Sequence, residues 1–397
     1  MKSIAVITVG RSDYGIYRPV LRRIREESSL RLGMIVSGTH LEPAFGRTEA
    51  RIEADGFPIR DRVPLTPSED EPASIAESMG RGVSGFARAY AGARPDLLVV
   101  LGDRYEMAAA ALAALPFKIP VAHIHGGELT RGAFDDALRH AITKTSHLHF
   151  VATGESARRV VQMGEEPWRV TISGAPSLDS LRDFRPLPGR ALETLVGLPL
   201  DRPPLLVTLH PVTLEYERTD RQVEDLLAAL EVAGLPILFT LPNADTRGRV
   251  IRERVLAFVR THPGARAVEA LGTEAYFSFM AVAAAMVGNS SSGILEAASF
   301  RLPVVDVGAR QEGRLRPANV IHCDDDRQAI GAALKQALSP GFRDGLRGLI
   351  NPYGDGNAAP RIVDRLVTAP LDDRLLQKRF FDLPVPPDVR PDGRGGP

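Results

Sequence analysis

Most of the side chains that could move a proton fall in two neighbouring runs of the sequence. The run HIHGGE at positions 123–128 leaves an apolar segment through two glycines, and Asp135 and Asp136 follow a few residues later. Imidazoles and carboxylates are the usual general acids and bases of enzymes. His125, Glu128 and Asp135 therefore predict acid–base chemistry, although Asp135 would serve equally well as a helix cap.

Charged residues also stand just behind two other apolar segments. Asp103 and Arg104 come one glycine after Leu97–Leu101, and Arg11 comes one glycine after Ile4–Val9. An adjacent acid and base at a strand end cannot both face the core, so they suit a ligand site, or a capping Asp beside a surface Arg. A guanidinium behind a glycine can pair with a phosphate in a bidentate manner, or stay solvated.

The run GNSSSGILEAA at positions 288–298 is the strongest candidate for an anion site. An apolar segment enters a serine-rich turn there, and a helix begins with its free N–H groups at the turn. Glu296 lies one turn into that helix, where it could accept hydrogen bonds from a ribose diol or be an ordinary surface carboxylate. The run is neither a Walker loop nor a GxGxxG fingerprint.

Two further observations bear on single residues. His40 also follows an apolar segment, where a capping or solvated histidine is the plainer interpretation. The histidines and acids match no familiar zinc spacing, and Cys323, the single cysteine, is far from them. We therefore expect no metal.

Short apolar runs bounded by Gly or Pro alternate with amphipathic stretches along the chain. This alternation predicts parallel sheets covered by helices on both faces. A stretch rich in Pro, Gly and Arg, Ala175–Pro203, suggests a linker, after which the pattern restarts. The predicted fold class is α/β, with two Rossmann-like, doubly wound domains that face a cleft.

Length and composition fit a globular protein of two domains and argue against some kinds of binding partner. The 397 residues are enough for two domains, and 49 basic side chains balance 49 acidic ones. A chain with no net charge has no global field for nucleic acid or an anionic membrane. The single cysteine and the short N-terminal apolar stretch predict a cytoplasmic protein.

Several long runs together resemble the hydrolysing UDP-N-acetylglucosamine 2-epimerases, in order from residue 1 to about residue 360. That family includes enzymes of bacterial sialic-acid pathways and the epimerase half of the animal bifunctional enzyme. The runs are RSDYG (11–15), SGTHLEPAFG (37–46), GDRYE (102–106), HIHGGELTRGAFDDALRHAITK (123–144), LHPVT (209–213), FTLPNAD (239–245), GNSSSGILEAA (288–298) and VGARQEGR (307–314).

The resemblance implies a glycosyltransferase-B arrangement in which the last helix packs back on the first domain. We expect an N-terminal domain at 1–180, which carries the acid–base groups, and a nucleotide-side domain at 181–365. A segment at 366–383 would return to the first domain, and 384–397 would be a disordered tail. The implied reaction removes the C2 proton, eliminates the nucleoside diphosphate to leave a 2-acetamidoglucal, and then adds water. No metal or redox cofactor is required, and a homodimer or homotetramer is expected.

Position by position, the resemblance assigns roles to individual residues. Those implied to hold the diphosphate, or to lie close to it, are Arg11, Gly15, Arg104, His210, Ser290, Ser291 and Arg310, and His210 is a catalytic candidate as well. Glu296 would bind the ribose, and Asn243 and Leu271 would lie near the nucleoside. Those implied to surround the sugar are His40, Asp103, Glu128, Asp135 and, as a further candidate, Asp136.

One position departs from many relatives, including the animal enzyme, which have glutamate where this chain has His125. The proton transfer expected there then falls to His125, or to Glu128 or Asp135. The departure also leaves two substrates open. One is UDP-N-acetylglucosamine, which gives N-acetylmannosamine. The other is a UDP- or GDP-linked 2,4-diacetamido-2,4,6-trideoxyhexose of the legionaminic-acid type.

Three other kinds of protein fit part of the pattern. A glycosyltransferase of the same fold would bind the same diphosphate, but it would not need the group of Asp103, Glu128 and Asp135. A nucleotide-sugar sensor would bind ligand without exchanging the C2 hydrogen. A non-hydrolysing epimerase would return the epimer with its nucleotide still attached.

Overall fold

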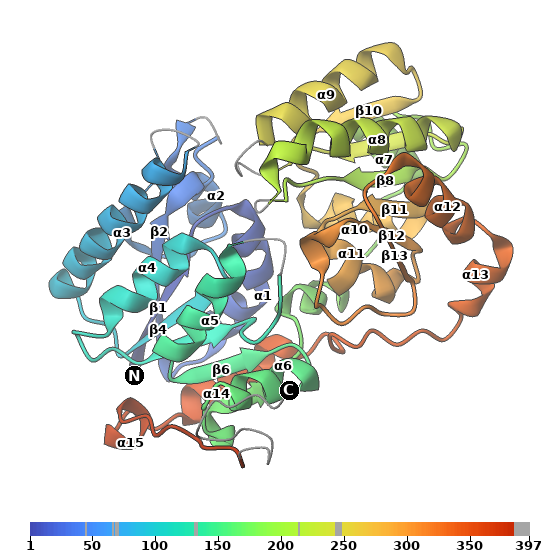
Figure 1. The fold of residues 1–397 in the computed structure, drawn as a ribbon. Coiled ribbons are helices and arrows are strands. Elements are labelled where there is room, and N and C mark those ends of the chain that lie inside the picture. Colours follow the sequence, from blue (N-terminus) through green and yellow to red (C-terminus); the bar gives the residue numbers. More distant parts are fainter. Residues whose placement is uncertain are drawn as a thin grey trace, which may run out of the picture.

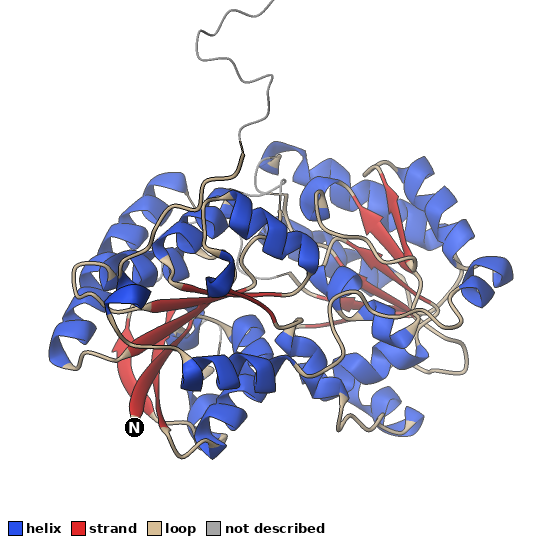
Figure 2. Ribbon diagram, turned by 90° about the horizontal axis from the view of Figure 1, so that it is seen from below, coloured by secondary structure: helices blue, strands red, loops and turns tan. Residues whose placement is uncertain are grey.

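Two parallel sheets, each sandwiched between helices, organise the chain (Figures 1 and 2). The computed structural model describes residues 1–43, 46–65, 67, 71–130, 134–212, 215–242 and 248–384. Within these residues no helix is both long enough and apolar enough to span a bilayer. The α/β fold class with two doubly wound sheets, predicted from the alternation of apolar and amphipathic segments, is confirmed.

Within the described residues, the first sheet has seven strands in the order β3-β2-β1-β4-β5-β6-β7. Its strands are β1 (Lys2–Thr8), β2 (Leu30–Ser37), β3 (Ile59–Val63), β4 (Leu97–Leu101), β5 (Val121–Ile124), β6 (Leu148–Val151) and β7 (Val170–Ile172). The helices of this part are α1 (Arg11–Glu26), α2 (Glu49–Ala54), α3 (Pro72–Gly92), α4 (Tyr105–Ala114), α5 (Asp135–Thr145) and α6 (Gly154–Gln162).

The second sheet repeats the same order with six strands, β10-β9-β8-β11-β12-β13, in the described part of the chain. Its strands are β8 (Leu205–Thr208), β9 (Ile237–Thr240), β10 (Ala265–Val268), β11 (Ala285–Gly288), β12 (Val304–Val307) and β13 (Val320–Cys323). Its helices are α7 (Gly189–Val196), α8 (Thr219–Val232), α9 (Gly248–Thr261), α10 (Gly272–Val282), α11 (Ser291–Leu295), α12 (Arg327–Ala337) and α13 (Pro340–Gly345).

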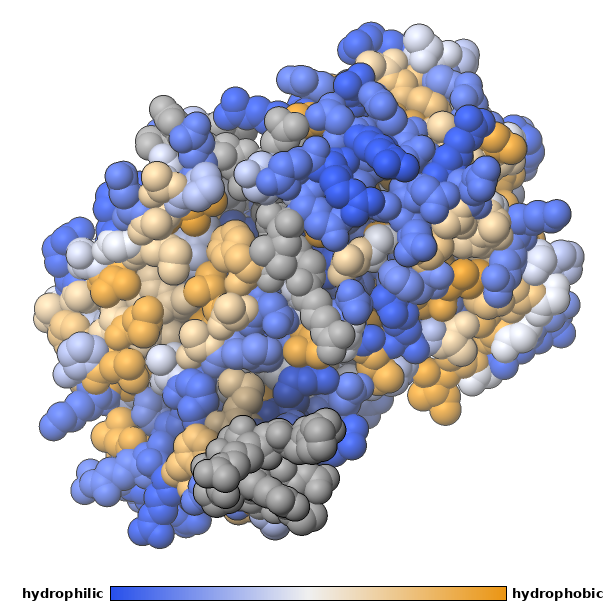
Figure 3. Space-filling model, viewed as in Figure 1, coloured by the Kyte–Doolittle hydropathy of each residue, from blue (hydrophilic) through white to orange (hydrophobic). Residues whose placement is uncertain are grey.

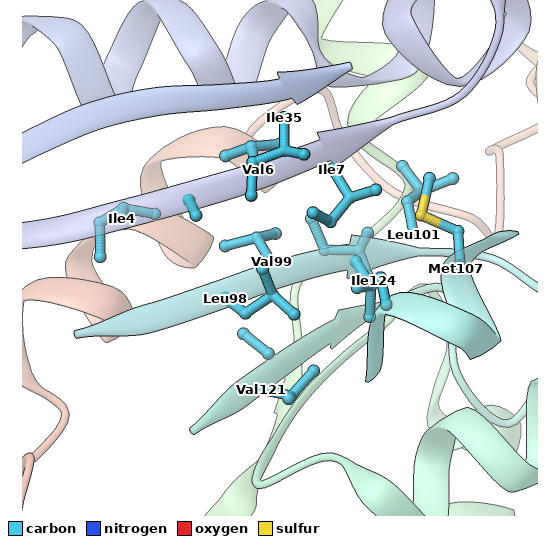
Figure 4. Close-up of a cluster of buried hydrophobic side chains, with 14 of the residues drawn as sticks. Ile4, Val6, Ile7, Ile35, Leu98, Val99, Leu101, Met107, Val121 and Ile124 are labelled. Carbon is cyan, nitrogen blue, oxygen red and sulfur yellow. The ribbon is translucent and has the colours of Figure 1, made fainter. Parts of the chain in front are cut away.

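The central strands are apolar on both faces because helices cover both sides of each sheet. Figure 4 shows Val6 of β1, Val99 of β4 and Ile124 of β5 in one buried cluster, and each is fully buried. Burial of one such side chain contributes about 1.5–3 kcal/mol relative to exposure. This core fixes the positions at which the strands end, and therefore the positions of the polar residues that follow them.

In each sheet the strand order reverses beside the first strand, which defines a switch point where ligands bind in folds of this type. The first switch point lies between β1 and β4, and the second between β8 and β11. The loops that leave these four strands carry Arg11, Asp103, His210 and Ser290. Fold topology thus places four of the predicted site residues at the two ligand-binding edges.

After the second domain the chain returns to the first. Residues of α14 (Ala358–Thr368) belong to the core of the first domain. The expected domain boundaries stay a prediction. The Lys2 ammonium donates hydrogen bonds to the carbonyls of Val367 and Ala369, at 2.5 and 2.7 Å. Of the expected tail 384–397, residues 385–397 lie outside the described residues.

Hydrophobic side chains gather on the surface of the first domain over α3 and α4, whereas the face over α8 and α9 is hydrophilic (Figure 3). Leu112 and Leu115 at the end of α4 are 46% and 44% exposed. The expected homo-oligomer stays a prediction.

Candidate active site

Two residues behind β5 form the central contact of the first-domain half of the site. His125 and Glu128 are both buried, and Nδ1 of the imidazole lies 2.5 Å from Oε1 of the carboxylate. The backbone of His125 has a φ of +63°, a left-handed conformation that a residue with a side chain rarely adopts. The turn therefore directs this side chain away from the path of the strand and towards Glu128.

A buried arginine, Arg139 of α5, joins this pair to the end of β4. It donates to the carbonyl of His125 at 2.8 Å and to the hydroxyl of Thr130 at 3.1 Å, and it forms an ion pair with Asp103. Burial alone would lower the pKa of a guanidinium, but the carboxylates of Asp103 and Glu128 raise the pKa of Arg139. Arg139 therefore stays charged, and it links Asp103 and His125 into one unit.

His40 lies inside a buried polar network. Its Nε2 atom is 2.9 Å from the hydroxyl of Thr8 and its Nδ1 atom is 2.7 Å from that of Thr48. Thr8 in turn donates to Asp13 at 2.7 Å. Burial lowers the pKa of His40 to about 4. Both ring nitrogens of His40 are therefore engaged inside this network, and its expected place beside the sugar stays a prediction.

In the second domain, Asn289 ties the two strands of the switch point together. Its side chain accepts a hydrogen bond from the backbone N–H of His210 at 2.7 Å and donates to the carbonyl of His210 at 2.8 Å. Gly288 just before it has a φ of +126°, and a side chain there would collide with the carbonyl of Thr208. Ser290 then caps α11, and Ser291 is the first residue of that helix.

Glu296 follows α11 and is a buried carboxyl with only one of its oxygens satisfied. Oε1 accepts a hydrogen bond from Ser177 at 2.5 Å, whereas Oε2 is buried and has no partner among the described residues. Burial raises the pKa of Glu296 to about 7, although His125 and Arg314 lie close enough to oppose the rise. Glu296 is therefore not the surface carboxylate that its position near a helix start allowed.

The two halves meet through Arg314, in the loop that follows 3-10 helix η7 (Ala309–Gln311). Its guanidinium lies 3.5 Å from Glu128 and donates to the carbonyl of Leu129 at 3.2 Å. A side chain at Gly15 of α1 would come within 3.8 Å of Thr273 in α10. The Ser290 side and the acid–base side of the predicted site therefore share one location between the domains.

Buried polar atoms normally find partners, so atoms that lack one mark places where a ligand or water binds. Four such atoms of the described chain belong to residues on the two sides of this contact between the domains: His125 Nε2, Arg139 Nε, Glu296 Oε2 and Arg314 Nη1. A small cavity of about 10 Å³ lies beside the ion pair of Glu128 and Arg314, and both residues line it. A more open hollow of about 740 Å³ along α6 and β7 is lined by none of the predicted site residues.

The remaining candidates lie around this centre. Arg310 donates to the carbonyl of Asn289 at 3.3 Å, next to Ser290. In the first domain, Arg11 is the first residue of α1, and Arg104 lies just before α4 and pairs with Glu106. Asp135 is the first residue of α5, and Asp136 accepts a hydrogen bond from the N–H of Thr130. In the second domain, Leu271 directly precedes α10. Asn243 lies outside the described residues. Among those described, no group of three or more His, Cys, Asp or Glu could hold a metal ion.

Three residues of the site had no assigned role in the sequence: Arg139, Arg314 and Ser177. Two of them are arginines within the quoted family runs, and an arginine in a sequence cannot be told from a solvated one. Ser177 lies in 3-10 helix η4 (Pro176–Leu181), inside the segment expected to be a linker. Each of the three residues is recognised as part of the site only in the folded chain, where it contacts a segment that is distant in the sequence.

Comparison with known proteins identifies the family of the chain. The sequence profile of the UDP-N-acetylglucosamine 2-epimerase family matches residues 22–367. The UDP-N,N'-diacetylbacillosamine 2-epimerase (hydrolyzing) of Legionella pneumophila is 37% identical over 95% of this chain and 99% of its own length. The GDP/UDP-N,N'-diacetylbacillosamine 2-epimerase (hydrolyzing) of Campylobacter jejuni is 35% identical over 96% and 99%.

A solved structure supports the fold. The UDP-GlcNAc 2-epimerase from Neisseria meningitidis bound to UDP-GlcNAc aligns with a TM-score of 0.80 and 19% identity, over 92% of this chain and all of that one. The chain belongs to the UDP-N-acetylglucosamine 2-epimerase family, with the glycosyltransferase-B type of fold. Within that family it is an enzyme of the hydrolysing nucleotide-sugar 2-epimerase class.

Proposed function

We propose that the chain hydrolyses a UDP- or GDP-linked 2,4-diacetamido-2,4,6-trideoxyhexose, inverts C2, and releases the free sugar and the nucleoside diphosphate. The observation that carries this choice of substrate is the pair of relatives named for N,N'-diacetylbacillosamine, at 37% and 35% identity over nearly the whole chain. These relatives favour the diacetamido sugar over UDP-N-acetylglucosamine, which the resemblance gave as the first reading.

UDP-N-acetylglucosamine remains the second candidate because both sugars need the same chemistry at C2. They differ only at C4, which carries an acetamido group or a hydroxyl, and at C6, which carries a methyl or a hydroxymethyl group. The product from UDP-N-acetylglucosamine would be N-acetylmannosamine. The Neisseria structure is too distant in sequence, at 19% identity, to decide between these substituents.

In the proposed complex the diphosphate lies at the start of α11. The hydroxyls of Ser290 and Ser291 and the guanidinium of Arg310 would hold it from the second domain, and Arg11 and Arg104 would approach it from the first. Free N–H groups at a helix start favour a negative charge, which supports this placement. The unpartnered oxygen of Glu296 would accept a hydrogen bond from the ribose.

The sugar would then lie against the buried charges of the first domain. A base removes the C2 hydrogen, the C–H electrons form a C1=C2 double bond, and the C1–O bond breaks as the nucleoside diphosphate leaves. Water adds its oxygen to C1, and a hydrogen reaches C2 on the opposite face. A nearby set of acid–base groups is worth on the order of 10² to 10⁴ in rate for such steps.

The direct test is product analysis with four substrates: UDP- and GDP-linked forms of both sugars. In heavy water and with no acceptor, we expect the diacetamido sugar to give free epimer with deuterium at C2, together with the nucleoside diphosphate. Faster turnover of UDP-N-acetylglucosamine would select the second candidate. A nucleotide-linked epimer, or a need for an acceptor, would contradict the hydrolysing reaction.

A further inference from the structure

The surroundings of His125 hold its ring in place and leave one ring nitrogen, Nε2, without a hydrogen-bond partner among the described residues. The backbone of this residue is fixed from both sides, since its N–H donates to Phe150 at 2.9 Å and its carbonyl accepts from Arg139 at 2.8 Å. Nδ1 is engaged by Glu128. Nε2 is buried and has no partner among the described residues.

Glu128 determines which nitrogen of His125 carries the proton. Burial would raise the pKa of this carboxyl, but His125, Arg314 and Arg139 together hold it well below its ordinary value. The carboxylate can only accept a hydrogen bond, so Nδ1 must be the donor. When the ring carries a single proton, it therefore has its lone pair at Nε2, as in a catalytic histidine oriented by a carboxylate.

The carboxylate itself depends on the second domain. Arg314 is only 8% exposed, and besides its ion pair with Glu128 it donates to the carbonyl of Leu129 at 3.2 Å. These contacts place a second-domain cation against the first-domain acid–base pair. The orientation of His125 is therefore complete only when the two domains are in contact.

We propose that His125 is the catalytic base that removes the C2 hydrogen through Nε2, and that Glu128 and Arg314 are positioning residues that hold it across the domain boundary. This inference rests on the proposed function and assigns its first step. The hydrogen leaves C2 as a proton on Nε2, the electron pair forms the C1=C2 bond, and the C1–O electrons leave with the nucleoside diphosphate. His125 later releases its proton to solvent, while water supplies the hydroxyl at C1 and the hydrogen at C2.

Three other candidates for this step are engaged in contacts with other residues. Asp103 is paired with Arg139, and Glu128 is engaged by both His125 and Arg314. Both nitrogens of His40 are hydrogen-bonded in the buried network. The charged or titratable groups that face His125 come from each neighbouring element: His123 of β5, Glu128 behind it, Arg139 of α5, Glu296 after α11 and Arg314.

The experiment follows cleavage of the C2–H bond in single turnovers, with substrate carrying hydrogen or deuterium at C2. His125→Asn is the informative variant, because asparagine tolerates the left-handed backbone and cannot act as a base. We expect bond cleavage to slow by about 10²-fold or more, and the Kd of the nucleoside diphosphate to change by less than about threefold. The acidic limb of the pH–rate profile, which is the loss of rate as the pH is lowered, should disappear in this variant.

Substitution of the two positioning residues should shift the acidic limb of the pH–rate profile in opposite directions. A merely structural role would not produce shifts of opposite sign. Glu128→Gln removes a negative charge beside the ring, so protonation of the ring becomes harder and the acidic limb should move to lower pH. Arg314→Gln removes a positive charge, and the limb should move to higher pH. Each change should also slow C–H cleavage by about tenfold or more.

Arg316→Gln is the matched control, because Arg316 lies in the same loop but pairs with Asp306 at 3.0 Å. It should leave both rate and profile unchanged. A His125→Asn enzyme with near-normal C–H cleavage and an intact acidic limb would overturn the inference. If that variant does not fold, limb shifts of the same sign in Glu128→Gln and Arg314→Gln would overturn it instead.

Failure of the proposed function would look different. It would appear in the wild-type enzyme, as no free sugar from any of the four substrates or no solvent deuterium at C2. An active wild type with the expected products, combined with an active His125→Asn, would reject only the base.

Discussion

The two halves of the site are built from different kinds of group. In the first domain, charged side chains satisfy one another: Asp103 pairs with Arg139, and His125 pairs with Glu128. In the second, a helix start and hydroxyls stand beside Glu296, a carboxyl that no cation neutralises directly. Fixed charges suit proton transfer, whereas N–H groups and hydroxyls suit the grip on a leaving diphosphate.

This difference predicts that the two halves will respond separately to mutation. Changes in the first domain should lower turnover at saturating substrate, because they alter groups that act in the transition state. Changes in the second should alter affinity or pH dependence and spare turnover.

The largest effect is expected in the first domain, for Asp103→Asn. Asparagine keeps the shape but removes the charge that pairs with Arg139 and the capacity to take a proton. Turnover should fall by a factor on the order of 10² or more, while calorimetry should find the Kd of the nucleoside diphosphate within about threefold. Asp61→Asn, which alters a first-domain pair with Arg60 on β3, is the control and should change neither. If Asp103→Asn lost nucleotide binding as well as turnover, the predicted separation of catalysis in the first domain from binding in the second would be wrong.

A smaller effect is expected for Glu296→Gln in the second domain, measured as stability against pH. The pKa of Glu296 is raised from 4.5 to about 7 by burial, so the folded protein keeps a proton that the unfolded chain has already lost. The wild-type free energy of unfolding should therefore fall between about pH 4.5 and 7, by an amount on the order of 2 kcal/mol.

The glutamine variant should lack this part of the pH dependence. Denaturant unfolding at several pH values measures it, with Glu224→Gln, an exposed helix position, as the control. A wild-type stability that rises over the same interval would contradict the assignment.

The smallest effect is expected for Ser291→Ala. Loss of one hydroxyl at the proposed phosphate site should weaken nucleoside diphosphate binding by about three- to tenfold, the range for one hydrogen bond. Turnover at saturation should stay within about twofold. Ser299→Ala, at an exposed hydroxyl that accepts from Asn351, provides the control. An unchanged Kd in Ser291→Ala would remove this residue from the phosphate site.

The sequence predicted the interior of each sheet much better than its borders. The short apolar runs at 30–37, 97–101, 237–240 and 304–307 form β2, β4, β9 and β12. The edges of the two sheets, β3, β7, β10 and β13, have a weaker pattern in the sequence. Interior strands are apolar on both faces, but edge strands are part-exposed. Ile59–Val63 even carries three charges, and so it has no apolar run to recognise.

For the site, the sequence indicated where polar groups leave the strands, but not which groups pair. The ends of β1, β4, β5 and β11 were identifiable because glycine and polar residues follow apolar runs there. The burial of His40, and the roles of Arg139 and Arg314, depend on segments that meet only in the folded chain. A charge and its partner cannot be matched from spacing when they come from different domains.

The return of α14 to the first domain has a consequence for the order of folding. Lys2 is bonded to the carbonyls of Val367 and Ala369, and α14 contributes side chains to the core of the first domain. The native core of that domain therefore includes contacts between residues more than 300 positions apart. Because closing so long a loop costs chain entropy, we expect these contacts to form late in folding.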